Sequence, residues 1–294
     1  MSDVIEESTQ PGAHAGPFAP LIDTTVRIVT WNLWWRWGPW RERAAAITAT
    51  LAGVNADVLC LQEVWIDGDT SSAHQITAML GYEHVVTGHR LVLADDDGVE
   101  VGFGNAIVSR WPITSHRVRE LPGVEGADEL RVGLLADIAG PRGVLQVTTT
   151  HLNWRYDHSA VRQAQVRAMC RLIDEAKPAI GRSFPPVLCG DFNAEVGSEE
   201  MRMLLGLAAV PVPKLVFHDA WALAGNDTAG LTWTRENRYA AAELEPDRRI
   251  DYVLVGWPKA GGAGNPVRCT VHGMAEVGGV LPSDHLAVVA DLRY

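Results

Sequence analysis

The 294-residue chain lacks any apolar run that approaches the roughly 18 residues of a membrane-spanning helix. Its opening stretch, MSDVIEESTQPGAHAGPFAP, also lacks the basic start and the apolar segment of a secretion signal. We therefore expect a cytoplasmic protein without a membrane span. Because this stretch is acidic and contains Pro, Gly and Ser, it predicts a flexible N-terminal tail over residues 1–24.

Cysteine is scarce, and the cysteines that are present lie far apart. There are four, Cys60, Cys170, Cys189 and Cys269, and none has the CxxC spacing of a metal site. Two of them lie inside apolar runs. The pattern favours buried, reduced thiols over a disulfide framework.

Basic residues are outnumbered by acidic ones, 25 Lys and Arg against 36 Asp and Glu, which gives a net charge of −11. This argues against a surface that coats nucleic acid, because non-specific affinity comes mostly from phosphate neutralisation by basic side chains. A local basic cleft is still compatible with this balance. An excess of carboxylates also suits a protein that binds divalent cations.

Neither an internal repeat nor a Pro/Gly linker divides the chain, so we expect a single domain over residues 25–294. Short apolar, β-branched runs predict strands at Val26–Trp31, Val58–Leu61, Ala106–Val108, Val132–Ile138, Val144–Thr149, Val187–Cys189, Ile250–Val255, Cys269–His272 and Leu286–Leu292. Helices are predicted at Trp40–Leu51, Ser71–Leu80, Ser159–Ala176 and Ser198–Leu207. Two facing sheets with helices outside would bury every continuous run, which makes the fold class α/β.

Polar residues stand at particular ends of these strands. They are Asn32, Glu63, His151, Asn153, Asp191 and Asn193 after strands, and Asp251, Asp284 and His285 at or before the start of strands. In a mostly antiparallel arrangement, the ends of some strands and the starts of others meet at one rim. Carboxylate and amide oxygens at such a rim suit Mg²⁺ or Mn²⁺. Histidines there would contact phosphate oxygens, and a carboxylate would orient or deprotonate a water molecule.

Taken singly, each of these residues reads more readily as a turn, a solvated edge or a core residue. The ordered set WN, QE, THL, GDFN, RIDY and SDH, however, resembles the signature of the endonuclease/exonuclease/phosphatase superfamily, over essentially residues 26–294. The resemblance implies a four-layer α/β sandwich, with helices outside two mainly antiparallel sheets packed face to face. It also implies metal-dependent hydrolysis of a phosphate ester by water, with one or two Mg²⁺ or Mn²⁺ ions.

The resemblance assigns the metal side of the site to three residues. Glu63 of QE would be the principal metal ligand, and Asn32 of WN would support the metal or its water shell. Asp284 of SDH would sit near a metal or the leaving group.

The same resemblance assigns the chemistry to five others. Asp191 of GDFN would orient and activate the attacking water, and Asn193 would hold the phosphate or that water. His285 would bind the scissile phosphate, and Asp251 of RIDY would fix the tautomer and charge of this histidine. His151 of THL would contact the phosphate; the apurinic endonucleases carry a tyrosine at that place.

Further substrate contacts are expected outside the catalytic motifs. Asn153 follows THL, and Trp233 lies in a GLTW segment that resembles a loop preceding RIDY in this superfamily. Arg162 lies on the helix after THLNW, where it would either reach the site or face solvent.

The stretch WNLWWRWGPW, residues 31–40, concentrates five of the eleven tryptophans. We expect part of it to pack under the following helix. Trp34, Trp35 and Trp37 leave the strand where a substrate would approach and would form an aromatic wall, with Arg36 as a candidate phosphate contact. A membrane-interface belt is the alternative, disfavoured without a neighbouring basic cluster.

The leading functional hypothesis is a Mg²⁺/Mn²⁺-dependent phosphoesterase that acts on a soluble phosphate mono- or diester. A nuclease of the same superfamily is the alternative, disfavoured by the acidic balance and by His151. A sphingomyelinase-like lipid phosphodiesterase and a non-catalytic binding module are less favoured, because no secretion signal is seen and all six motifs are chemically intact.

Overall fold

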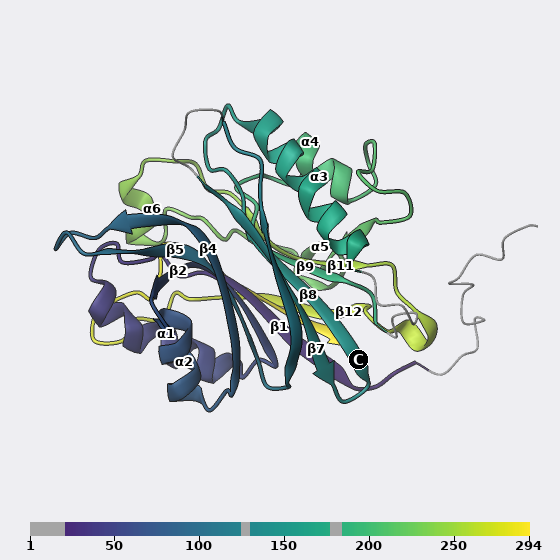
Figure 1. Ribbon diagram of the computed structural model, residues 1–294, viewed down its shortest axis with the longest axis horizontal. Coiled ribbons are helices and arrows are strands. Elements are labelled where there is room, and N and C mark those ends of the chain that lie inside the picture. The colour runs from purple at the N-terminus through teal and green to yellow at the C-terminus, as the bar shows by residue number, and fades with distance from the viewer. Residues whose placement is uncertain (1–20, 125–129, 177–183) are drawn as a thin grey trace, which may run out of the picture.

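The computed structural model describes residues 21–124, 130–176 and 184–294. In this part of the chain two β-sheets lie face to face at the centre, and helices cover the outer face of each (Figure 1). Helices α1 (Trp40–Val54) and α2 (Ser72–Leu80) cover one sheet. Helices α3 (Ser159–Glu175) and α4 (Glu199–Leu204) cover the other. The predicted four-layer α/β sandwich is confirmed.

The first sheet has seven strands among the described residues. In spatial order they are β12 (Pro266–His272), β13 (Ala287–Arg293), β1 (Thr25–Asn32), β2 (Val58–Asp67), β5 (Glu100–Ser109) and β4 (His84–Ala94), with β3 (Thr70–Ser71) paired to β2. The second sheet has six described strands: β10 (Phe217–Asp219), β11 (Asp251–Gly256), β9 (Val187–Asp191), β8 (Gly143–His151), β7 (Val132–Gly140) and β6 (Ile113–Glu120). Three short helices complete the described elements: α5 (Ala220–Ala224), α6 (Arg238–Ala242) and the 3₁₀ turn η1 (Ala260–Gly262).

Two strand pairs decide where the polar ends meet. Among the described strands, β1–β2 and β8–β9 are parallel, and every other named pair is antiparallel. A parallel pair needs a crossover connection, which α1 provides in the first sheet and α3 in the second. The carboxyl ends of all four parallel strands therefore reach the same rim of the sandwich.

The core between the sheets explains why the strand sequences are continuous apolar runs. Ile28 and Cys60 of the first sheet and Val147, Cys189 and Val253 of the second are fully or almost fully buried in one cluster. The opposite faces of the same strands are buried under the helices. Each fully buried aliphatic side chain contributes about 1.5–3 kcal/mol, so alternation with polar residues would cost stability here.

All predicted strands and helices are present, with shifted ends. Helix α4, for example, ends at Leu204 rather than at Leu207. Four strands were not predicted: β3, β4, β6 and β10. Strands β4 and β6 are the edge strands of their sheets and are largely half-buried or exposed, so they lack a continuous apolar run. No helix in the described ranges is both long and apolar enough to cross a membrane.

The predicted tail, residues 1–24, lies mostly outside the described residues. Its last few residues are described and join the domain. The amide of Ile22 donates to the carbonyl of Gly261 at 2.9 Å, and the carbonyl of Thr24 accepts from the amide of Tyr294 at 2.8 Å. The folded region therefore includes at least residues 22–24.

Candidate active site

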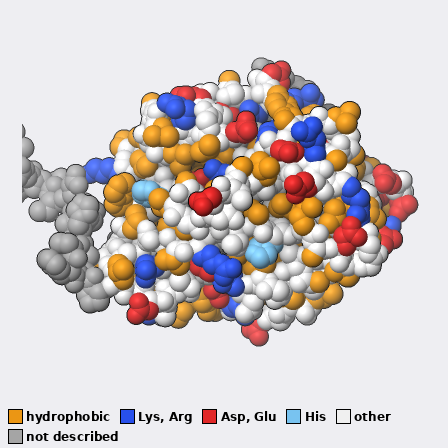
Figure 2. Space-filling view, turned by 180° about the vertical axis from the view of Figure 1, so that it is seen from behind, with side chains coloured by type: hydrophobic (Ala, Val, Ile, Leu, Met, Phe, Trp, Pro, Cys, Tyr) orange, Lys and Arg blue, Asp and Glu red, His pale blue; other side chains and the backbone are white. Residues whose placement is uncertain are grey.

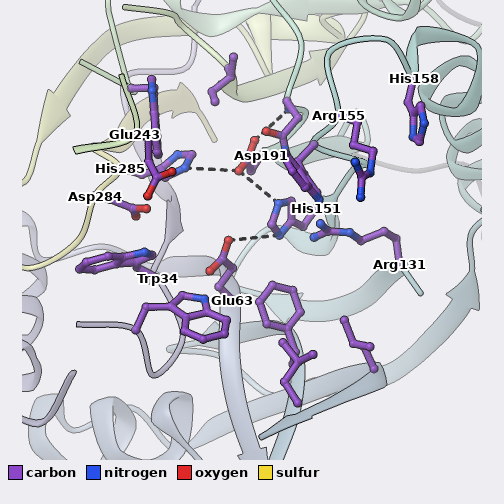
Figure 3. Close-up of a pocket in the computed structure, with 18 of the residues that line it drawn as sticks. Trp34, Glu63, Arg131, His151, Arg155, His158, Asp191, Glu243, Asp284 and His285 are labelled. Carbon is purple, nitrogen blue, oxygen red and sulfur yellow. Dashed lines mark hydrogen bonds and ion pairs between the residues drawn. The ribbon is translucent and has the colours of Figure 1, made fainter. Parts of the chain in front are cut away.

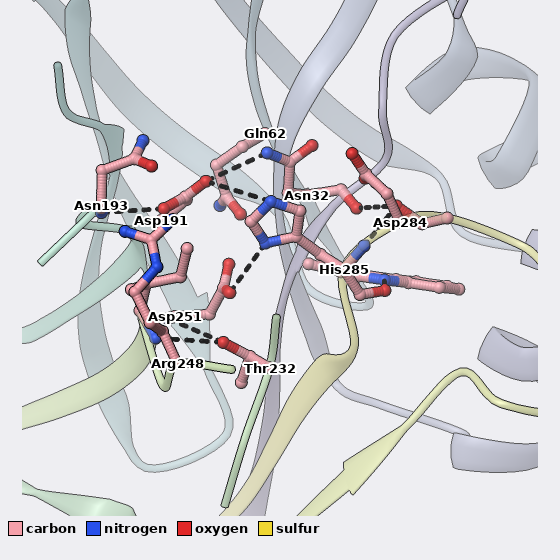
Figure 4. Close-up of polar contacts among 12 residues, drawn as sticks. Asn32, Gln62, Asp191, Asn193, Thr232, Arg248, Asp251, Asp284 and His285 are labelled. Atoms are coloured by element: carbon pink, nitrogen blue, oxygen red, sulfur yellow. Dashed lines mark hydrogen bonds and ion pairs between the residues drawn. The ribbon is translucent and has the colours of Figure 1, made fainter. Parts of the chain in front are cut away.

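The ends of two parallel strands bring Asn32 and Glu63 together. Asn32 is the last residue of β1 and stands opposite Gln62 of β2. Between Leu61 and Val64 the register of β2 against β5 shifts, and Glu63 within this irregularity adopts a left-handed φ of 50°. The side-chain amide of Asn32 donates to Asp191 Oδ2 at 3.1 Å (Figure 4). The same amide donates to Glu63 Oε1 at 2.9 Å. Asn32 thus links the rims of the two sheets.

Three neighbouring strands of the second sheet place His151, Asp191 and Asp251 in one row. His151 pairs with Asp191 across β8–β9, and Asp251 pairs with Asp191 across β11–β9. His151 Nε2 lies 3.4 Å from Asp191 Oδ2, while His151 Nδ1 lies 3.9 Å from Glu63 Oε1 (Figure 3). The register of three strands therefore assembles residues that are a hundred positions apart in the chain.

His285, just before β13, completes the row. Its Nδ1 is 2.9 Å from Asp251 Oδ2, and its Nε2 is 3.7 Å from Asp191 Oδ2. Burial opposes protonation of the ring, but three neighbouring carboxylates outweigh it and raise the pKa of His285 well above its usual value. They belong to Asp251, Asp191 and Asp284. The ring is held as an imidazolium that donates Nδ1–H to Asp251, and the indole of Trp233 meets it edge-on with centroids 4.9 Å apart.

The carboxylates at the floor of the site are buried close together. Burial, reinforced by Asp284, raises the pKa of Glu63 to about 7. Burial, reinforced by Asp251, raises the pKa of Asp191 to about 6. Burial also lowers the pKa of His151 well below its usual value, so this ring is neutral. Ionising these carboxylates is therefore unfavourable unless a positive charge lies close to them.

Asn193 fixes the orientation of Asp191. Its backbone amide donates to Asp191 Oδ1 at 2.9 Å, and its side-chain amide donates to the carbonyl of Leu152 at 3.1 Å. The left-handed φ of 50° at Asn193 makes both contacts available from one short turn. Both carboxylate oxygens of Asp191 thus have defined donors, one from Asn193 and one from Asn32.

A cleft of about 1390 Å³ opens over this floor (Figure 3). Its aromatic lining comprises Trp34, Trp37, Phe103, Trp154 and Trp233. The charged lining among the described residues comprises four arginines, Arg90, Arg131, Arg155 and Arg248, and six carboxylates, Glu63, Asp157, Asp191, Glu243, Glu245 and Asp284. The cleft therefore offers aromatic faces and isolated cations but no excess of positive charge.

The tryptophan-rich stretch divides between core and cleft, as predicted. Trp31 is fully buried, and Trp34 and Trp37 line the cleft. Trp35 was expected in the aromatic wall, but it is only 3% exposed and packs with Trp65 in a small cluster behind the wall.

The structure places Arg36 away from the cleft, so its expected phosphate contact is corrected. Its guanidinium is buried, pairs with Asp95 Oδ2 at 2.9 Å, and lies 4.8 Å from the ring of Trp40 and 4.7 Å from that of Trp65. A buried guanidinium held by a carboxylate and two aromatic faces is committed to packing.

Arg162 and Asn153 also have other partners than a substrate. Arg162 is 5% exposed; its Nε lies 2.5 Å from Glu200 Oε1, and it donates to the carbonyls of Asn153 and Arg155 at 3.2 and 2.6 Å. The side-chain oxygen of Asn153 accepts from the Arg155 amide at 3.1 Å and lies 3.0 Å from His158 Nδ1. Both residues shape the loop between β8 and α3, which carries cleft residues, and neither lines the cleft itself.

Sequence reasoning missed Arg131 and Arg248, which line the cleft beside the row. Figure 3 shows Arg131 next to His151. Arg248 pairs with Glu245, and its guanidinium lies 4.5 Å from the ring of Tyr156. Arg248 could have been found, because it stands in the same RRID segment as a motif residue. Arg131 precedes an ordinary apolar strand and carries no sequence signal.

Two groups of side chains are candidates for holding a divalent cation. In one, Asp191, Asp251 and His285 each offer a ligand atom, and these atoms lie within 4.8 Å of one another. However, the raised pKa of His285 favours its protonated form, and a protonated imidazole is not a metal ligand.

The other group centres on Glu63. This carboxylate has only 13% of its side chain exposed, and its pKa is raised by burial and by the neighbouring Asp284, so two carboxylates of the kind that Mg²⁺ prefers adjoin here. The amide of Asn32 turns its nitrogen to Glu63, while its oxygen accepts from the Trp34 amide at 2.9 Å. Among the described residues, His151 Nδ1 has no hydrogen-bond partner, although it is buried 3.9 Å from Glu63 Oε1. This Nδ1 of His151 and the carboxylate of Glu63 with its raised pKa lie at one place, which fits a cation with its bound waters.

Comparison with known families matches most of this chain. A model described as the Endonuclease/Exonuclease/phosphatase family matches residues 29–285, a range that includes every motif residue from Asn32 to His285. None of the curated proteins compared with the chain matches it.

Solved structures share the fold at low sequence identity. An endonuclease/exonuclease/phosphatase from Beutenbergia cavernae DSM 12333 is 24% identical with a TM-score of 0.70, over 92% of this chain and 72% of that chain. D. rerio TDP2 complexed with single strand DNA product is 20% identical with a TM-score of 0.72, over 92% and 100%. The human Nocturnin catalytic domain with bound sulfate anion is 20% identical with a TM-score of 0.64, over 91% and 93%.

Proposed function

We propose that this chain, which belongs to the Endonuclease/Exonuclease/phosphatase family, hydrolyses a phosphate mono- or diester with Mg²⁺ or Mn²⁺. Members of this family are typically hydrolases of phosphate esters. The observation that carries the proposal is the position of Asn32, whose amide bonds at once to Glu63, on the cation side, and to Asp191, on the side of the attacking water. One residue thus holds the two functional groups next to each other.

The cation, when bound, supplies Lewis-acid polarisation of the phosphate and neutralises charge that develops on it. Glu63 would hold it, supported by Asn32 and by Asp284, which also lines the cleft. The side chain of Glu63 is 13% exposed and Asp284 is 7% exposed, so little bulk water competes with a cation for these carboxylates.

Asp191 would orient the water and accept its proton. Two fixed donors, from Asn32 and Asn193, keep this carboxylate in one orientation, and a pKa of about 6 makes it a stronger base than an ordinary aspartate. His151 is neutral and lies 3.4 Å from the same carboxylate, where it would hold the water or a phosphate oxygen.

His285 would donate a hydrogen bond to the scissile phosphate through Nε2. Asp251 accepts from Nδ1 and keeps the ring cationic, so a positive charge already stands where negative charge grows during attack. Trp233 covers one side of the imidazolium and limits its contact with water.

The charge of the cleft favours a small ester over a polynucleotide. A protein that grips successive phosphates needs a basic track. Here six carboxylates accompany four arginines among the described lining residues, and Arg90 and Arg248 are each paired with a glutamate. On the face drawn in Figure 2, acidic and basic side chains are interspersed with apolar ones rather than gathered by sign.

A nuclease acting on single strands is the second candidate. Arg131 and Arg155 lie in the same cleft as the exposed face of Trp154, and alternating cations and aromatic faces suit stacked bases and phosphates. A TDP2 structure of similar fold is described as a complex with single strand DNA product.

The test compares initial rates on bis(p-nitrophenyl) phosphate and on a single-stranded oligonucleotide, with Mg²⁺ or Mn²⁺, between about 50 and 200 mM salt. We expect faster hydrolysis of the small ester, weak salt dependence, complete loss with excess chelator and recovery with added cation. Oligonucleotide cleavage that collapses with salt, without ester turnover, would establish the nuclease instead. Absence of turnover on both substrates, and on the monoester p-nitrophenyl phosphate as well, would contradict a catalytic role.

A further inference from the structure

A single buried guanidinium holds the loop that forms the aromatic side of the cleft. Arg43 lies in helix α1 and is 0% exposed. Its Nη1 donates to the carbonyl of Leu33 at 2.7 Å and to that of Pro282 at 2.9 Å. It therefore joins the loop after β1 to the segment that leads into Asp284 and His285.

The other terminal nitrogen, Nη2, donates hydrogen bonds to three more carbonyls of the same loop. Arg43 Nη2 donates to Trp34 at 2.7 Å, Trp35 at 3.0 Å and Trp37 at 3.1 Å. Trp34 and Trp35 have left-handed φ values of 56° and 30°, which bulky side chains rarely adopt. This unusual backbone turns successive carbonyls toward one point, and the guanidinium compensates for the strain.

Arg43 also contacts the side chain of Trp34, which lines the cleft. The guanidinium lies 4.8 Å from the centre of the Trp34 ring, and the ring of Tyr239 lies 4.7 Å from it with the planes tilted. Trp34 and Trp37 both line the cleft. The position of this aromatic surface is therefore set from beneath by Arg43.

A second hydrogen bond joins the same two segments, the loop after β1 and the segment before β13. Ser283 Oγ donates to the carbonyl of Asn32 at 2.7 Å, one residue beyond the Pro282 carbonyl that Arg43 binds. The loop after β1 and the segment before β13 are thus fastened at adjacent points.

We propose that Arg43 is a positioning residue that sets the substrate-binding wall of Trp34 and Trp37 by binding five carbonyl oxygens of two segments. The kinetic part of this inference rests on the proposed function, whereas its structural part does not. Apart from His285, the residues of the catalytic row are held by strand registers of the second sheet, so loss of Arg43 contacts should weaken substrate binding more than the chemical step.

The test replaces Arg43 by lysine, which keeps the charge but offers three donors in place of five. Arg41→Lys is the matched control, because Arg41 belongs to the same helix, and its side chain is 63% exposed and pairs with Asp97 outside the cleft. Both proteins are labelled with 5-fluorotryptophan and compared by ¹⁹F NMR, with Trp34→Phe and Trp37→Phe used for assignment.

We expect Arg43→Lys to shift or broaden the signals of Trp34 and Trp37 and to leave those of Trp111 and Trp257 in place. Arg41→Lys should move none of these four. Unchanged Trp34 and Trp37 signals would overturn the inference. A change spread over all tryptophans would also overturn it, because it would indicate a general structural role. If the lysine variant does not fold, Arg43→Gln serves with the same criteria.

Kinetics supply the second readout. Arg43→Lys should raise KM for the ester by about tenfold and change kcat by less than about threefold. A fall in kcat with unchanged KM would contradict positioning of the wall. If the wild-type protein hydrolyses no ester, the proposed function fails, and the NMR comparison still decides the role of Arg43.

Discussion

The loop from β1 to α1 and the loop from β8 to α3 are built alike but charged differently. Each follows the first strand of a parallel pair, and each presents a tryptophan to the cleft, Trp34 in one and Trp154 in the other. In each, a buried arginine of the following helix binds loop carbonyls. The second arginine, Arg162, is paired with the buried carboxylate of Glu200, whereas no ion pair of Arg43 occurs among the described residues.

Because of this difference in pairing, Arg162 only stabilises its own loop, whereas Arg43 also interacts electrostatically with residues of the site. The charge of Arg162 is neutralised by Glu200, so its role ends with the loop. Burial lowers the pKa of Arg43 to about 10, while Asp284 and Glu63 oppose that shift. The guanidinium charge therefore interacts with two carboxylates on the cation side of the site. The first loop therefore belongs to the half that would hold the cation. The second adjoins the half that would activate water.

The largest expected effect comes from breaking the water-activating half. Asp191→Asn keeps the shape of the side chain but removes the carboxylate that would accept the proton, so kcat should fall by about 10³-fold. The loss should persist at any Mg²⁺ or Mn²⁺ concentration, because the cation is held elsewhere. Initial rates at saturating ester measure this, with an unchanged melting curve as the control. A near-normal rate would refute the role of Asp191.

Breaking the support of the second loop should mainly affect stability. Arg162→Met leaves Glu200 buried without its partner, so the free energy of unfolding should fall by about 3–5 kcal/mol. Arg202→Met is the control: it breaks the exposed pair with Glu199 and should cost no more than about 1 kcal/mol. Urea unfolding measures both. Equal losses would show that the buried Arg162–Glu200 pair stabilises the fold no more than the exposed Arg202–Glu199 pair.

A smaller effect should appear in the pH dependence of stability. Burial raises the pKa of Glu63 from 4.5 to about 7, so the folded, cation-free protein retains a proton that the unfolded chain releases. The free energy of unfolding should therefore fall as pH rises from about 4.5 to 7, by at most about 3 kcal/mol from this group. Asp191 should add a similar loss at lower pH.

Melting temperatures between pH 5 and 8 test this sign. Glu63→Gln should flatten the decline, and Mn²⁺ should stabilise the wild-type protein more at pH 8 than at pH 5. The lowered pKa of His151 opposes this decline below about pH 6.5, so the comparison of the two proteins carries the test. Identical pH profiles of the wild-type protein and Glu63→Gln without a cation would contradict the assigned burial of Glu63.

The sequence predicted the layers and the motif residues because both have local signals. Apolar runs marked the buried strands, and polar residues at their ends marked Asn32, Glu63 and Asp191. The exposed edge strands β4 and β6 carry no such run and were missed. Arg36 and Arg162 were assigned to substrate because their partners, Asp95 and Glu200, lie 59 and 38 positions away in the chain and are found only by folding.

The central claim is that the cation belongs to the first half of the site, at Glu63, and the imidazolium of His285 to the second. Titration of Mn²⁺, followed by the EPR signal of the free ion, tests it on the wild-type protein, Glu63→Gln and His285→Ala. We expect Glu63→Gln to weaken Mn²⁺ binding by at least about tenfold and His285→Ala to change it by less than about twofold. If His285→Ala loses the ion while Glu63→Gln keeps it, the cation sits among Asp191, Asp251 and His285, and the account is wrong.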